Sequence, residues 1–119
     1  MNIKKISTLA QIMGGDKTTI REVFHPKNEK LPFSYSLAHA TLGVGESSLP
    51  HIMSTSEVYY ILSGEGTMHI NDESQAVRTD TAIEIPIGAT QYIENTGSTE
   101  LAFLCIVSPA WREDDEKLA

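Results

Sequence analysis

The stretch that decides the fold is GESSLPHIMSTSEVYYILSG, residues 45–64. Its second half is rich in Val, Tyr and Ile, which favour the pleated surface of a β-strand, and glycines bound it at both ends. His51 and Met53 are two positions apart, so both point to the same face of an extended strand. Glu57 and Tyr59 share one face of the next strand for the same reason. The stretch therefore predicts strands that carry an imidazole, a thioether and a carboxylate.

Short alternating or apolar runs, separated by turn residues, continue along the chain. The further runs are Phe33–Leu42, Gly66–Asn71, Thr81–Pro86, Thr90–Asn95 and Leu101–Val107. No long segment has helical periodicity. This spacing of strands and turns predicts an all-β sandwich or barrel. Because no linker, repeat or low-complexity segment interrupts the pattern, residues 1–119 are predicted to form a single domain.

Composition and charge exclude several classes of partner. The chain has 9 Lys and Arg against 16 Asp and Glu, a net charge of −7. Such a surface repels phosphate backbones and anionic lipids, so neither nucleic acid nor a membrane surface is expected as a partner. The acidic run Arg112–Lys117 is predicted to be a solvated tail. Neither a signal peptide nor a bilayer-length apolar segment is predicted, which indicates a cytoplasmic protein. Cys105, the only cysteine, is predicted to be a buried, inert thiol.

Two groups of residues resemble the two sequence motifs of the cupin superfamily. The first, G-x5-H-x-H-x3-E-x6-G, is matched in spacing over residues 45–64, and the second, G-x5-P-x-G-x2-H-x3-N, over residues 80–95. The resemblance implies a single-domain cupin, a double-stranded β-helix or jelly-roll barrel. Asp80 replaces the first glycine of the second motif, a mild change because Asp tolerates left-handed backbone better than most residues.

The departures from the motifs fall on the metal ligands that the resemblance implies. His51 and Glu57 match the family, whereas Met53 and Gln91 stand where histidines are expected. Imidazole and carboxylate suit Fe, Mn, Ni, Co or Zn, an amide oxygen is a weaker ligand, and a thioether prefers Cu(I). The predicted metal set is His51, Glu57, Gln91 and Met53. Alternatively, Met53 fills the core and Gln91 hydrogen-bonds a ligand or Glu57.

Two functions follow, and the residues leave both open. The first is a metal-dependent enzyme of the isomerase, lyase or dioxygenase type, acting on a small polar or carbonyl-bearing metabolite in the barrel mouth. Glu57 or Tyr59 would then move protons. The second is a non-catalytic, metal-free binding or sensing module that uses the same mouth. His39 is either a replacement ligand or a surface or interface histidine. Small cupins commonly pair through edge strands, so the resemblance also implies a homodimer, to which Met1–Ile6 could add a strand.

Overall fold

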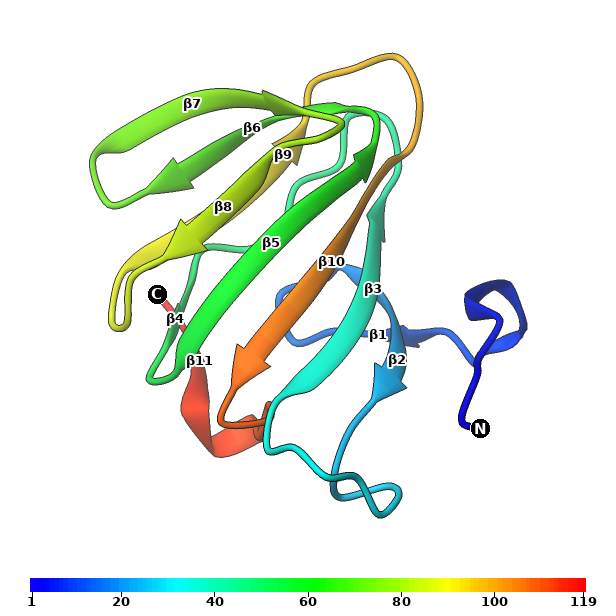
Figure 1. The fold of residues 1–119 in the computed structure, drawn as a ribbon. Coiled ribbons are helices and arrows are strands. Elements are labelled where there is room, and N and C mark those ends of the chain that lie inside the picture. Colours follow the sequence, from blue (N-terminus) through cyan, green and yellow to red (C-terminus); the bar gives the residue numbers. More distant parts are fainter.

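The computed structural model describes residues 1–119, which form two antiparallel sheets packed face to face (Figure 1). The first sheet has the order β1-β2-β3-β10-β5-β8. Its bounds are β1 Ile12–Met13, β2 Thr19–Phe24, β3 Ser36–Leu42, β10 Leu101–Ser108, β5 Ser56–Ser63 and β8 Ala82–Ile85. The second sheet has the order β11-β4-β9-β6-β7. Its bounds are β11 Glu116–Leu118, β4 His51–Met53, β9 Thr90–Asn95, β6 Glu65–Ile70 and β7 Glu73–Arg78. The all-β prediction is confirmed.

The core lies between the two sheets and is built by strand alternation. In the register of the first sheet, Phe103 lies opposite Ala40 on one side and Ile61 on the other, and all three are fully buried. Met68 and Ile93 face them from the second sheet. Burying such apolar side chains contributes about 1.5–3 kcal/mol each for the larger ones. This shared core fixes which face of each strand points inward.

Left-handed backbone occurs where the two motifs require it. Gly64 has φ +88°, and a Cβ there would lie 2.6 Å from the carbonyl oxygen of Glu100, so only glycine fits. Asp80, at the position where the family pattern has glycine, has φ +69°. The prediction that Asp80 tolerates this conformation is confirmed.

The two ends of the chain lie on different sides of the barrel (Figure 1), and the prediction for the C-terminal run needs correction. Residues 1–5 form no strand. They lead into a 3₁₀ turn, η1 (Ile6–Thr8). At the other end, β11 follows a second 3₁₀ turn, η2 (Glu113–Asp115), and pairs with β4. The solvated-tail prediction is therefore wrong for Glu116, because strand pairing carries that residue into the barrel. No helix has the length and apolarity needed to cross a membrane.

Candidate functional site

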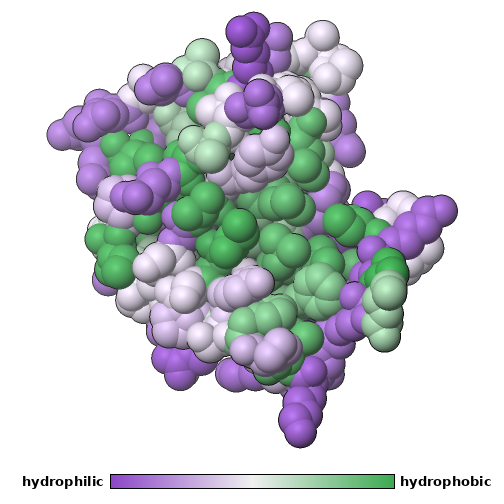
Figure 2. Space-filling model, viewed as in Figure 1, coloured by the Kyte–Doolittle hydropathy of each residue, from purple (hydrophilic) through white to green (hydrophobic).

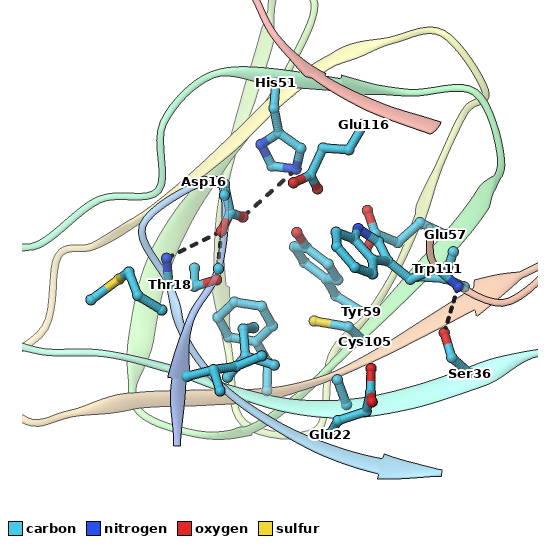
Figure 3. Close-up of a pocket in the computed structure, with 18 residues that line it drawn as sticks. Asp16, Thr18, Glu22, Ser36, His51, Glu57, Tyr59, Cys105, Trp111 and Glu116 are labelled. Carbon is cyan, nitrogen blue, oxygen red and sulfur yellow. Dashed lines mark hydrogen bonds and ion pairs between the residues drawn. The ribbon is translucent and has the colours of Figure 1, made fainter. Parts of the chain in front are cut away.

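A cavity of about 140 Å³ lies between the segment around β1, the inner faces of β3, β10 and β5, and β11 (Figure 3). Its 18 lining residues come from β1, β2, β3, β4, β5, β10 and β11 and from the segments that join or follow them. Half of these residues are hydrophobic, and the polar ones include His51, Glu57 and Tyr59. The cavity therefore brings together three of the side chains that the sequence singled out.

His51 is held rigidly in β4. Its backbone lies opposite Gln91 of β9, and the imidazole is almost fully buried. The Nδ1 atom lies 2.8 Å from the carbonyl oxygen of Leu49. A carbonyl can only accept, so Nδ1 carries the proton of this bond. The Nε2 atom faces the carboxylate of Asp16, with 3.7 Å between Nε2 and Oδ2.

Glu57 lies on the inner face of β5, with only 7% of its surface exposed. Its Oε1 atom is buried and has no hydrogen-bond partner. Burial raises the pKa of this carboxyl to about 8. The Gln91 carboxamide works in the opposite direction, and repulsion from Asp16 and Glu116 adds to the rise. Glu57 is therefore protonated at neutral pH, and its carboxyl group can both donate and accept a hydrogen bond.

Gln91 and Tyr59 form a buried pair behind Glu57. The Tyr59 hydroxyl donates to Oε1 of Gln91 across 3.3 Å, and the Tyr59 ring packs on Phe103 with 4.7 Å between ring centroids. Burial, with repulsion from Glu57, raises the pKa of the Tyr59 phenol well above its usual value, so the phenol stays neutral. The Nε2 atom of Gln91 has no hydrogen-bond partner. Gln91 itself is fully buried and does not line the cavity.

Met53 and His39 lie away from the cavity lining. Met53 is 1% exposed and points to the same side of β4 as His51, but it is not among the lining residues. In β3, Ser36 and Ala38 line the cavity. His39 follows Ala38 directly and therefore lies on the opposite face of the strand, together with Thr41. The structure therefore gives no support to His39 as a replacement ligand.

Sequence reasoning missed most of the lining residues, among them Asp16, Trp111 and Glu116. Asp16 follows two glycines, and its Oδ1 accepts hydrogen bonds from the backbone N–H and the hydroxyl of Thr18, at 3.1 and 2.6 Å. An aspartate directly after a Gly-Gly turn is the one local signal that could have drawn attention to it. Trp111 and Glu116 depend on how the C-terminal segment folds back, which no local pattern shows.

Asp16 and Glu116 make one end of the cavity acidic. Burial raises the pKa of Glu116, repulsion from Asp16 adds to this rise, and His51 and the indole of Trp111 work against it. Figure 3 shows the side chains of Asp16, His51 and Glu116 gathered at one end of the cavity. Two carboxyl groups thus face one imidazole there.

The predicted metal set does not fit a tightly bound divalent ion. Nowhere do three His, Cys, Asp or Glu side chains come together in positions to share an ion. Of the four predicted ligands, only His51 and Glu57 are strong donors for first-row metals, because Met53 supplies a soft thioether and Gln91 an amide oxygen that already accepts from Tyr59.

Comparison with known proteins identifies the class. A cupin domain model matches residues 38–107, more than half of the chain, so the chain belongs to the cupin family. The predicted jelly-roll cupin fold is thereby confirmed.

Three individual proteins illustrate the similarity. The uncharacterized protein MJ1618 of Methanocaldococcus jannaschii is 38% identical over 104 residues, which is 87% of this chain and 82% of that protein. An oxalate-binding protein of Thermotoga maritima is 39% identical over 51 residues, 43% of this chain and 42% of that protein. The crystal structure of a predicted oxalate decarboxylase, also from Thermotoga maritima, superposes with a TM-score of 0.76 at 26% identity, covering 88% of this chain and 96% of the other.

Proposed function

We propose that this cupin binds a small organic molecule in the cavity bounded by His51, Glu57 and Tyr59, and that it does so without a resident metal ion. The observation that carries the proposal is Glu57, a buried acid whose Oε1 has no partner in the protein and whose side chain lines the cavity. A buried polar group left unpaired costs about 1–3 kcal/mol. A ligand that hydrogen-bonds to Glu57 would recover that free energy, and its binding would stabilise the fold.

Glu57 is also the group best suited to exchange a proton with a bound molecule. A general acid or base is most effective when its pKa lies near the working pH, and the pKa of Glu57 is about 8. Tyr59 suits an orienting role better, because its phenol is neutral and already bonded to Gln91. Catalysis by Glu57, with Tyr59 orienting, remains a prediction within the same proposal.

The second candidate is the metal-dependent enzyme predicted from the sequence, and the state of the His51 imidazole favours it. The Nδ1 proton of His51 is held by the Leu49 carbonyl, which leaves the Nε2 lone pair free, as in histidines that ligate metals. His51 would be the strongest ligand of such a site. The ion would supply Lewis-acid or redox chemistry to a molecule in the same cavity.

Metal analysis and thermal unfolding separate the two candidates. The protein would be purified without a histidine tag, analysed for first-row metals, and unfolded with and without chelator and with a set of small metabolites. The proposal predicts metal far below one ion per chain, an unfolding temperature that ignores chelator, and stabilisation by at least one small molecule. Near-stoichiometric metal, with a loss of stability in chelator, would instead support the second candidate.

The predicted homodimer finds support on the outer face of the first sheet. Residues opposite one another on β3, β10 and β5 share a face, and Leu37, Ile106 and Val58 form one such row. Leu104 and the exposed Tyr60 lie in the next row. Figure 2 shows hydrophobic residues gathered over the middle of this side of the molecule. We infer that a second copy covers this face, which shifts the predicted contact from the sheet edges to the sheet surface.

Light scattering tests the dimer. A charged residue on the outer face, Ile106→Glu, is expected to convert a dimer to a monomer because it would bury a charge at the contact. The exposed-edge variant Ser74→Glu on β7 is the matched control and is expected to remain dimeric. A monomeric wild-type protein would overturn the inference. The predictions of a cytoplasmic location and of no nucleic-acid or membrane partner remain predictions.

A further inference from the structure

The ionisable side chains around the cavity are mostly acidic. Its lining includes four acids, which are Asp16, Glu22, Glu57 and Glu116, and no lysine or arginine. His51 is the single basic side chain among the 18 lining residues. The chain as a whole carries a net charge of −7, so the field outside the cavity has the same sign. An anion entering this cavity would meet repulsion without a compensating cation.

We propose that the cavity takes an organic cation, namely a small amine that carries one ring-sized apolar group. This inference rests on the proposed function, because it names the class of molecule bound at the same site. Its basis is the lining of the cavity, which combines a cluster of acidic side chains with a wall of apolar and aromatic ones.

The ammonium group belongs at the acidic end. Asp16 is held in place through Oδ1 by Thr18, and its other oxygen, Oδ2, points toward His51. Glu116 approaches the same place from β11 (Figure 3). An acidic cluster alone would not define a ligand site. Glu57 supplies the independent observation, since it is a nine-tenths-buried acid that lines the cavity with an unpartnered oxygen. The carboxylates of Asp16 and Glu116 offer an ammonium group charge-assisted acceptors, and the neutral carboxyl group of Glu57 offers a further hydrogen-bond acceptor.

The apolar group belongs against the wall that β10 forms. Phe103, Cys105 and Val107 of β10 line the cavity with the ring of Tyr59, and the indole of Trp111 closes one side. An aromatic surface beside an acidic end suits a cation that also carries apolar surface, because ring faces attract cations. The volume of about 140 Å³ is close to that of an engineered protein cavity of about 150 Å³ that binds benzene. One aromatic ring with a short aminoalkyl arm therefore matches the space.

The ligand proposed for this chain differs in charge from the ligand in the name of one relative. The Thermotoga maritima relative is called an oxalate-binding protein. Oxalate is a dianion at neutral pH, and besides the neutral Glu57 the cavity offers it three further acids, Asp16, Glu22 and Glu116, against one histidine. Oxalate is therefore expected to bind this chain more weakly than an amine of similar size.

Calorimetry with a charge series tests the inference. The probes are benzylamine, which is cationic at neutral pH, its neutral analogue benzyl alcohol, its anionic analogue benzoate, and oxalate. All are titrated into the full chain at one fixed low salt concentration in the presence of a chelator. The expected order of affinity is benzylamine first, benzyl alcohol second and the two anions last.

Three variants locate the site. Asp16→Asn and Glu116→Gln each remove one charge and keep the shape, and each is expected to weaken benzylamine binding about tenfold. Neither is expected to weaken binding of benzyl alcohol. Asp114→Asn removes an exposed charge from the same C-terminal segment and is the matched control, with unchanged affinity. Thermal unfolding of each variant checks that it folds.

Each outcome bears on a different claim. Stronger binding of benzoate or oxalate than of benzylamine, or benzylamine binding unaffected by Asp16→Asn and Glu116→Gln, would overturn the cation inference while leaving a ligand-binding cavity. Absence of binding by all four probes would also overturn it. The proposed function is judged separately, by the metal analysis and metabolite set described above.

Discussion

The inner and outer faces of strands β3, β10 and β5 differ in what they can do. The row Ala38, Cys105 and Tyr59 faces inward and lines the cavity, whereas the neighbouring row His39, Leu104 and Tyr60 faces outward. Adjacent residues of each strand therefore point to opposite faces, one toward the cavity and the next toward the outer surface. The comparison teaches that three strands of this small barrel supply both a binding wall and an apolar patch suited to a second copy.

The largest contrast between the two faces is expected from truncating neighbouring residues of β10. Phe103→Ala removes a fully buried ring from the core and is expected to lower the free energy of unfolding by about 3–5 kcal/mol. Leu104→Ala, on the outer face, is expected to cost on the order of 1 kcal/mol or less in the monomer. Urea denaturation at a low protein concentration measures both. Equal losses would mean that the two faces are not distinct in the way described.

A pH series sharpens the contrast on the inner face. The pKa of Glu57 is raised from 4.5 to about 8 in the folded protein, so the folded state holds this proton more tightly than the unfolded state. The stabilisation is therefore complete below about pH 4.5 and is lost as the pH rises to about 8, by on the order of 5 kcal/mol at most. Glu57→Gln is expected to remove this slope.

The control for the pH series is an outer-face acid on the strand paired with β5. Glu84 is exposed and lies opposite Val58, and Glu84→Gln is expected to leave the slope unchanged. If Glu57→Gln and the wild-type protein lose stability in parallel between pH 5 and pH 8, measured by denaturant unfolding, Glu57 is not a buried neutral acid.

Restoring a histidine tests whether the inner face has kept the geometry of a metal site. Met53 lies on the same side of β4 as His51, and Gln91 lies opposite His51 in β9. Met53→His adds a strong donor to this group and is expected to tighten binding of Zn²⁺ or Mn²⁺ at least about tenfold. Isothermal titration with the metal alone measures the change. An unchanged affinity would show that side chains 51 and 53 do not converge with Glu57.

The smallest contrast is expected from two adjacent tyrosines. Tyr59→Phe removes the buried bond to Gln91 and is expected to destabilise the fold by about 1 kcal/mol, because Oε1 of Gln91 loses its partner. Tyr60→Phe removes an exposed bond to Asp80 and is expected to change stability by less than about 0.5 kcal/mol. Thermal unfolding of both variants measures the difference, and a larger loss for Tyr60→Phe would reverse the assignment of faces.

Much of the fold could be predicted from the sequence because its determinants are local. Alternation along Glu57–Ser63 placed Glu57 and Tyr59 on one face, and the motif spacings placed His51 near Gln91, as the β4–β9 pairing shows. Apart from Glu57, the acids that line the cavity could not be predicted. Asp16 arrives through the turn before β2, and Glu116 arrives because the C-terminal segment pairs with β4.

The same limit explains the wrong expectation for the C-terminal run. Four acids in six residues normally remain in water, and the pattern of charges along the chain says nothing about pairing with a strand that is distant in the sequence. The pairing of Glu116 with Met53 is a long-range contact that depends on the assembled sheet. The ligand class suggested by the cavity therefore rests on tertiary structure, whereas the family rests on the sequence motifs.

The most direct measurement is a ¹³C NMR titration of the glutamate side-chain carboxyls, with and without benzylamine, on the wild-type protein and Glu57→Gln. The account predicts one carboxyl that titrates near pH 8, is absent from the variant, and shifts when the amine enters the cavity. A wild-type spectrum in which residue 57 titrates near pH 4.5 and ignores every small molecule tried would contradict it.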